Sequence, residues 1–209
     1  MKYLIGIEYV CFGNNGRSPM AEAIATQEIV KRGLPIAASS SGCGLITAET
    51  HHTSATEKIA FIQEAYRNGL FTDYGREILP DAMQIYLGAT PSETEIDRCW
   101  ALMTSLEAGF RDQVLQEIGL QAAGCFQPTV AREGVHLLLP VNTGNAERVK
   151  KIYHASSYSP LIEIITAYAG YPQDLPVPFT HGIEEYRQIR DILREIVPIT
   201  IERAWRELR

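Results

Sequence analysis

The segment from Cys11 to Ser18 brings together residue types that could bind a phosphate group and attack it. A loop that leads from a strand into a helix points several backbone N–H groups at one place, with the positive end of the helix dipole behind them. Gly13 and Gly16 allow the tight curl that such a loop needs. Arg17 offers a planar pair of donors for two phosphate oxygens. The segment therefore predicts an anion-binding cradle.

Cys11 stands at the start of this loop, where its sulfur would form the floor of the cradle. The same N–H groups and dipole favour the thiolate over the thiol, which makes the sulfur nucleophilic near neutral pH. Ser18 can donate its hydroxyl to that sulfur, and Asn14 can brace the loop with its amide. The step of six residues from Cys11 to Arg17 lets both side chains reach one phosphorus atom. We expect the phosphate to be bound by the consecutive residues Phe12, Gly13, Asn14, Asn15, Gly16, Arg17 and Ser18.

A simpler interpretation of Cys11 is a buried thiol before an ordinary strand-to-helix turn, with the arginine on the surface. A cysteine and an arginine at this spacing are a weak signal by themselves. The whole pattern is stronger because an apolar strand, residues 3–10, precedes it and a helix opens directly after it. That helix is predicted from Met20 to Arg32, with a proline ahead of it and Gly33 after it.

Strands and helices alternate along the rest of the chain, which predicts an α/β fold with a mainly parallel sheet. The further predicted strands are Ile36–Ser40 and Cys99–Met103, with another apolar run at Val135–Pro140. The further predicted helices cover residues 53–68, 107–118, 146–153 and 183 to about 197, followed by a charged tail. Residues 161–168 fit a strand or a helix equally well. Ligands of such sheets bind beyond the carboxyl ends of the strands, where the cysteine loop lies.

Length and composition are those of a single domain without a bulk anionic partner. The chain has 209 residues and a formal net charge of −6, which argues against nucleic acid or an anionic membrane as a partner. No apolar run approaches the ~20 residues that span a bilayer, and the N-terminus does not resemble a secretory signal. The scattered cysteines at positions 11, 43, 99 and 125 predict free thiols in the cytoplasm and no metal site. We expect no cofactor.

The loop Cys11-Phe-Gly-Asn-Asn-Gly-Arg-Ser-Pro-Met-Ala-Glu22 resembles the CxGNxCRSPMAE signature of the low-molecular-weight protein tyrosine phosphatase family, which has arsenate reductase-like and phosphoarginine phosphatase relatives. The turn Ser40–Gly44 is similar to the family's SAGTG turn, whose serine, Ser40 here, helps to brace the phosphate loop. Leu102–Thr104 is similar to the end of the family's third strand. Tyr168–Arg187 is similar to the bacterial segment EFAGEPGDIPDPFGGSLEEYR.

This resemblance implies a flavodoxin-like, doubly wound fold with a central parallel four-stranded sheet and helices on both faces. It covers residues 1–71, 95–118 and 161–197. The whole chain, residues 1–209, is then one phosphatase-like domain with insertions near 73–94 and 119–160.

The resemblance also implies a two-step reaction, in which Cys11 attacks phosphorus and water then hydrolyses the phosphocysteine. In the family an aspartate protonates the leaving oxygen. That position falls on Val177 here, and a valine side chain has no acidic group that could donate a proton. Asp174 or His181 could substitute for it. Gly16 stands where the family has a second cysteine, so a protective disulfide with Cys11 cannot form inside the loop.

Three functions remain open. The first is a phosphatase that acts on phosphotyrosine or another small phosphomonoester, phosphoarginine included, and that binds phosphate, sulfate or vanadate. The second is thiol-dependent arsenate reduction, which needs two more cysteines as a disulfide relay, whereas Cys99 and Cys125 lie 26 residues apart. The third is a catalytically weak phosphate-binding or regulatory domain, which would account for the valine at the acid position.

Overall fold

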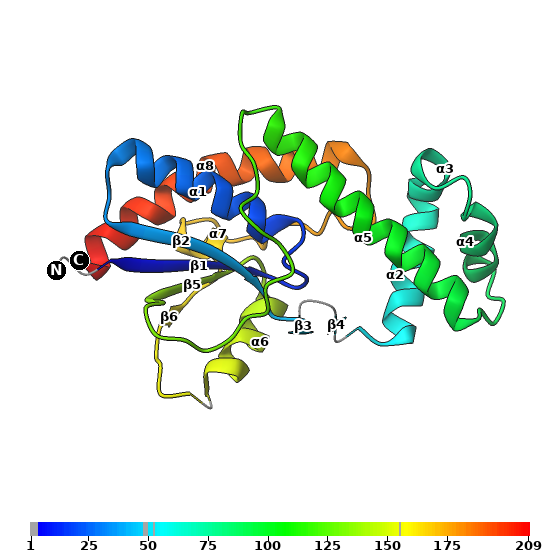
Figure 1. The fold of residues 1–209 in the computed structure, drawn as a ribbon, viewed down its shortest axis with the longest axis horizontal. Coiled ribbons are helices and arrows are strands. Elements are labelled where there is room, and N and C mark those ends of the chain that lie inside the picture. Colours follow the sequence, from blue (N-terminus) through cyan, green and yellow to red (C-terminus); the bar gives the residue numbers. More distant parts are fainter. Residues whose placement is uncertain (1–3, 48–49, 52, 155) are drawn as a thin grey trace.

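A four-stranded parallel sheet forms the centre of the fold (Figure 1). The computed structural model describes residues 4–47, 50–51, 53–154 and 156–209. The strands lie in the order β2, β1, β5 and β6, and each pairs with its neighbour in parallel. Their bounds, in the same order, are Ile36–Gly42, Ile5–Cys11, Leu137–Pro140 and Leu161–Ile162. The predicted α/β fold with a central parallel four-stranded sheet is confirmed.

Strand β1, from which the cysteine loop emerges, is buried on both faces. Its sequence is apolar almost throughout, as expected for a parallel strand covered on both sides. Ile7 and Tyr9 pack in one hydrophobic cluster with side chains of α1, α7 and α8. Val10 belongs to a second cluster with side chains of α6. These helices have the bounds Arg17–Arg32 for α1, Thr143–His154 for α6, Ile165–Tyr168 for α7 and Ile183–Leu208 for α8.

Four further helices pack on one another at the end of the sheet away from the C-terminus (Figure 1). They are α2, Ala55–Arg67; α3, Leu70–Tyr74; α4, Leu79–Tyr86; and α5, Glu93–Gln116. A small hairpin of β3, Leu45–Thr47, and β4, Thr50–His51, precedes α2 in the chain. Both α2 and α5 begin with a reciprocal capping box, formed by Ser54 with Glu57 and by Ser92 with Glu95. This helical group lies beside the carboxyl ends of the strands.

The predicted strand at Cys99–Met103 is wrong, because these residues lie inside helix α5. Their apolar side chains are part of a helical stripe, in which Cys99, Met103 and Phe110 are buried. Five residues are too few to distinguish a strand from one face of a buried helix. The third strand of the sheet is β5 instead, so the similarity of Leu102–Thr104 to a third-strand ending was misleading.

The end of α8 and the stretch 119–160 also differ from the sequence-based expectation. Helix α8 continues past Val197, where a charged tail was predicted, and it contains Pro198. Proline removes one backbone hydrogen bond, but Ile201 and Ala204 remain buried and keep the apolar face of the helix in the core. The stretch 119–160, expected as an insertion, contains β5 and α6 and therefore contributes to the central sheet and one of its layers.

Replacing Gly6 by alanine is expected to destabilise the fold by about 1–3 kcal/mol. A β-carbon at this position would overlap the carbonyl oxygen of Gly134, and a backbone atom cannot rotate away as a side chain can. The control is Gly109→Ala in α5, where a β-carbon meets nothing within 4 Å. That change should raise stability by about 0.5–1 kcal/mol through helix propensity. Urea unfolding measures both, and equal stabilities would contradict the close packing at Gly6.

Candidate active site

The loop between β1 and α1 folds around one buried asparagine. Asn14 Nδ2 donates to Ser40 Oγ at 2.8 Å and to Ser18 Oγ at 3.2 Å, while its Oδ1 accepts from the backbone N–H of Gln127 at 2.8 Å. Its φ of 48° lies in the left-handed region, which asparagine tolerates better than most residues. Ser40 Oγ in turn donates to Glu22 Oε2 at 2.6 Å. Strand β2 and helix α1 thus hold the loop through Asn14.

Cys11 is the last residue of β1 and lies at the bottom of the loop, with only 4% of its surface exposed. Ser18 Oγ donates a hydrogen bond to Cys11 Sγ at 2.9 Å. Because α1 begins at Arg17, its free N–H groups and the positive end of its dipole lie at the same end of the loop. A hydroxyl donor and a helix N-terminus both stabilise negative charge on atoms placed beside them.

Arg17 links this loop to a second one that follows α7. Its guanidinium is buried, and Nη1 donates to the carbonyl oxygens of Leu175 and Pro176, both at 3.3 Å. These residues directly precede Val177, so Arg17 holds the second loop against the first. A guanidinium carries five N–H donors, so this anchoring leaves capacity for binding an oxyanion.

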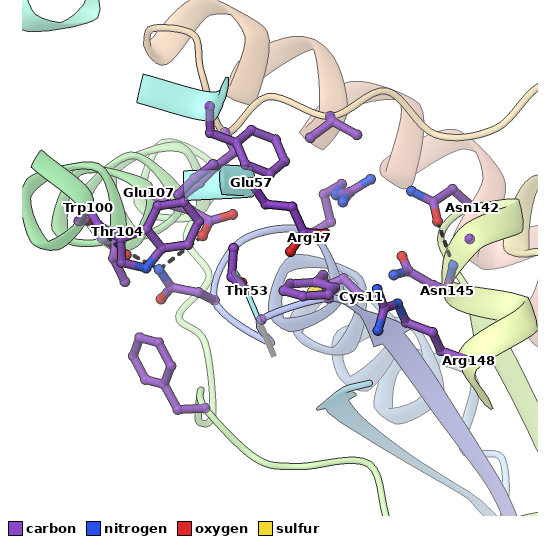
Figure 2. A pocket seen from close by; sticks show the side chains of 18 residues that line it. Cys11, Arg17, Thr53, Glu57, Trp100, Thr104, Glu107, Asn142, Asn145 and Arg148 are labelled. Carbon is purple, nitrogen blue, oxygen red and sulfur yellow. Dashed lines mark hydrogen bonds between the residues drawn. The ribbon is translucent and has the colours of Figure 1, made fainter. Parts of the chain in front are cut away.

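A cavity of about 300 Å³ opens over the cysteine loop and includes Cys11 and Arg17 in its wall (Figure 2). Three aromatic rings that line it stand together. The ring centroids of Trp100 and Phe179 lie 5.1 Å apart, and those of Phe61 and Phe179 lie 5.7 Å apart. Polar side chains from α6 and the turn before it face them across the loop: Asn142, Asn145 and Arg148. The cavity therefore joins an aromatic wall to a polar base.

Residues 6–73 match the family model for low molecular weight phosphotyrosine protein phosphatases. No curated protein matches the chain significantly. The fold is similar to that of the YwlE arginine phosphatase from Geobacillus stearothermophilus, with a TM-score of 0.57 and 19% identity over 97% of this chain and 94% of that one. It is also similar to a low molecular weight protein tyrosine phosphatase from Bacillus subtilis (TM-score 0.58, 17% identity, 98% and 100% covered). A third similar structure is DARP, a Drosophila arginine phosphatase, with a TM-score of 0.58 and 16% identity over 94% of this chain and 95% of that one. The chain has the low-molecular-weight phosphatase fold.

The resemblance found in the sequence is therefore confirmed, and the matched residues include the cysteine loop. The matched residues 6–73 contain β1, that loop, α1, β2 and α2. The expectation of a phosphatase-type hydrolase is confirmed at the level of this family match. The part of the fold after residue 73 lies outside the match and holds the remaining walls of the cavity.

The side chains expected to replace the family's acid lie elsewhere. Asp174 is exposed, and its carboxylate accepts from Thr143 N at 3.0 Å and from Thr143 Oγ1 at 3.2 Å, which places it at the start of α6. The Nε2 atom of His181 lies 3.3 Å from Asn68 Nδ2. Of the described residues, those that line the cavity include Val177 but neither Asp174 nor His181. The geometry gives no support to a proton-transfer role for either residue.

A face of α5 that sequence reasoning missed turns toward the phosphate loop. Trp100, Thr104, Glu107 and Arg111 recur at intervals of three or four residues, so they share one side of the helix. Asn15 Nδ2 donates to the carbonyl oxygen of Thr104 at 2.8 Å, and Arg111 Nη1 donates to the carbonyl oxygen of Asn15 at 2.6 Å. This spacing was the available signal, but the wrong strand prediction divided it between two elements.

Among the described residues that line the cavity, Arg17 and Arg148 carry a positive charge. Within the described part of the chain, no group of three or more His, Cys, Asp or Glu side chains is arranged to hold a metal ion. Over the same residues, no helix combines the length and the apolar character that crossing a membrane requires. The loop, the N-terminus of α1 and these two arginines are groups that can bind an anion.

Proposed function

We propose that the protein is a cysteine-dependent phosphatase that hydrolyses phosphotyrosine or a related small phosphomonoester through a phosphocysteine at Cys11. The observation that carries this proposal is the 2.9 Å hydrogen bond from Ser18 Oγ to Cys11 Sγ, at the floor of a cavity that also holds Arg17. A thiolate needs such a donor, and a phosphoryl group needs the adjacent cation. Phosphate, sulfate and vanadate should bind at the same place.

Two steps follow from this arrangement. In the first, Cys11 Sγ forms a bond to phosphorus while the bond from phosphorus to the leaving oxygen breaks, and that oxygen takes up a proton. In the second, a water oxygen bonds to phosphorus, the sulfur leaves as a thiolate, and the water loses a proton. Arg17 and the loop N–H groups stabilise the charge on the equatorial oxygens in both steps.

The aromatic wall supports an aryl phosphate as the substrate class. Phe61, Trp100 and Phe179 present ring faces and edges to the space above the loop, and aromatic rings pack favourably against one another. The similar solved structures are named as tyrosine phosphatases and as arginine phosphatases, so phosphotyrosine and phosphoarginine, free or in a protein, are the first substrates to compare.

Alkylation offers a direct test of this proposal. The wild-type protein should hydrolyse 4-nitrophenyl phosphate, and iodoacetate should inactivate it irreversibly by modifying Cys11. Inorganic phosphate should protect, because an oxyanion in the loop blocks access to the sulfur. Mass spectrometry identifies the modified cysteine. Turnover that survives complete carboxymethylation of Cys11 would overturn the proposed nucleophile.

A catalytically weak phosphate-binding or regulatory domain is the second candidate function. Val177 lines the cavity where the family resemblance expects an acid, and 45% of its surface is exposed. Val177→Asp separates the two functions, because a crippled enzyme should gain a large factor in rate from a restored acid. An unchanged rate means that the acid lies elsewhere or is not needed. Binding of phosphate by a wild-type protein without turnover would favour the regulatory function.

Arsenate reduction receives less support from the cysteines. Cys99 is fully buried in the apolar stripe of α5, and burial raises the pKa of its thiol to about 11. Burial likewise raises the pKa of Cys43 to about 11. Such thiols are poor nucleophiles near neutral pH, so neither is suited to relay a disulfide from Cys11. Cytoplasmic localisation stays a prediction from the free cysteines.

A further inference from the structure

We propose that Glu107, carried by α5, is the general acid that protonates the leaving group and then the base that activates water. This inference rests on the phosphatase function proposed above. Glu107 lines the same cavity as Cys11 and Arg17 (Figure 2). It thereby supplies from α5 the carboxyl group that Val177 cannot provide.

The carboxyl group of Glu107 lies directly against the phosphate loop. Its Oε2 accepts from Asn15 Nδ2 at 3.1 Å. A β-carbon built at Gly16 would lie 2.5 Å from Glu107 Oε1 and 3.1 Å from Cδ. The carboxyl therefore occupies the space that any side chain at Gly16 would take. The absence of a side chain there is what lets a carboxyl from another element approach the residue next to Arg17.

The other carboxyl group lining the cavity among the described residues is that of Glu57, and it is committed elsewhere. Glu57 Oε2 accepts from the backbone N–H and from the hydroxyl of Ser54, both at 2.8 Å, in the capping box of α2. These hydrogen bonds lower the pKa of Glu57. Its exposed carboxylate stays ionised and has no proton to give. Asp174 is outside the cavity, so Glu107 is the remaining candidate.

The surroundings of Glu107 favour its protonated form. Burial raises the pKa of this carboxyl, while Arg17, the hydrogen bond from Asn15 and Arg111 act in the opposite direction. Tyr186 of α8 interacts electrostatically with Glu107, and burial holds the pKa of that phenol well above its usual value, so the phenol is neutral. A raised pKa of this kind suits a carboxyl group to general-acid catalysis.

The proton balance of the two steps is complete with this residue. As Cys11 Sγ bonds to phosphorus, the leaving oxygen takes the proton of Glu107 and departs as a neutral alcohol or phenol. Glu107 is then a carboxylate. In the second step it takes a proton from the attacking water, whose oxygen bonds to phosphorus as the thiolate leaves. The carboxyl is protonated again, ready for another cycle.

The test is Glu107→Gln, because glutamine keeps an oxygen that accepts from Asn15 but has no acidic proton. We measure kcat/KM for phenyl phosphate, a poor leaving group, and for 4-nitrophenyl phosphate, whose phenolate departs unaided. Loss of a general acid costs about 10²–10⁴-fold, so this loss should appear for phenyl phosphate and be much smaller for the nitrophenyl ester. A parallel loss for both substrates, or no loss, would refute the role of Glu107.

Two matched variants complete the comparison. Glu117→Gln makes the same chemical change near the C-terminal end of α5, at an exposed ion pair with Arg187, and should keep the wild-type dependence on the leaving group. Asp174→Asn should keep it as well, and a selective loss there would transfer the role to Asp174. Urea unfolding of each variant identifies any effect that comes from instability.

A wild-type measurement covers the case in which Glu107→Gln does not fold. With rising pH, kcat/KM for phenyl phosphate should fall as the carboxyl loses its proton, and the nitrophenyl ester should show a smaller fall. Identical alkaline limbs for the two substrates would overturn the proposal. If the wild type hydrolyses neither ester, the phosphatase function itself fails. A wild type that is active beside an equally active Glu107→Gln variant contradicts only this inference.

Discussion

Replacing Cys11 by serine should abolish phosphatase turnover, with a loss of roughly 10⁴-fold or more in kcat. A serine hydroxyl is far less ionised than a thiol near neutral pH, so the attack on phosphorus loses its nucleophile. The fold should survive, because serine is similar in size and the residue lies at the end of β1, where Ser18 Oγ can still donate to it. Stopped assays with 4-nitrophenyl phosphate measure the residual rate.

The matched control for this prediction is Cys125→Ser. Cys125 is a partly exposed free cysteine outside the residues that line the cavity, so its replacement should leave the rate within about twofold of the wild type, as for most surface substitutions. Binding of vanadate or phosphate to Cys11→Ser, measured by calorimetry, should persist because the loop N–H groups and Arg17 remain. A Cys11→Ser variant with wild-type turnover would exclude the proposed covalent mechanism.

Replacing Arg17 by lysine should lower kcat by about 10²–10³-fold, the usual cost of removing a donor that stabilises transition-state charge. Lysine keeps the positive charge but lacks the planar fork that can bind two phosphate oxygens together. It would also weaken the links to the carbonyl oxygens of Leu175 and Pro176, so the second loop loses its anchor. The first effect acts on the transition state, and the second acts on the position of the second loop.

The comparison variant for Arg17 is Arg187→Lys on α8, which changes an exposed ion pair with Glu117. Exposed ion pairs contribute about 0–1 kcal/mol, so this variant should retain the wild-type kcat and nearly the wild-type unfolding free energy. Steady-state kinetics and urea unfolding of both variants separate the two roles. Equal kcat values for the wild type and Arg17→Lys would mean that this guanidinium is not part of the reaction.

Local sequence patterns predicted the first part of the fold well. The strand from residue 3 to 10, the helix closed by Gly33 and the strand at Ile36 correspond to β1, α1 and β2. Each carries signals that depend only on neighbouring residues, such as an apolar run, a proline in the first turn and a glycine with positive φ after the last turn. Tertiary contacts were not needed to interpret them.

The secondary structure of later parts of the chain could not be predicted from local patterns in the same way. Cys99–Met103 is apolar enough for a strand, and only the packing of α5 against α2 and α4 shows that this stretch is part of a helix. The apolar face of α8 likewise outweighs Pro198, because burial of Ile201 and Ala204 offsets the loss of one backbone hydrogen bond. In both cases long-range burial overrides a local signal.

The candidate site likewise has one part that local sequence determines and one part that depends on long-range packing. Cys11, Arg17 and Ser18 lie within eight consecutive residues, so the geometry of one short loop determines how they meet, and the sequence by itself determined that part. The proposed proton donor must come from an element outside that loop. Sequence distance cannot specify that approach, because it depends on how α5 packs beside the loop and on the space above Gly16. Only the tertiary structure brings Glu107 there and sends Asp174 to the start of α6.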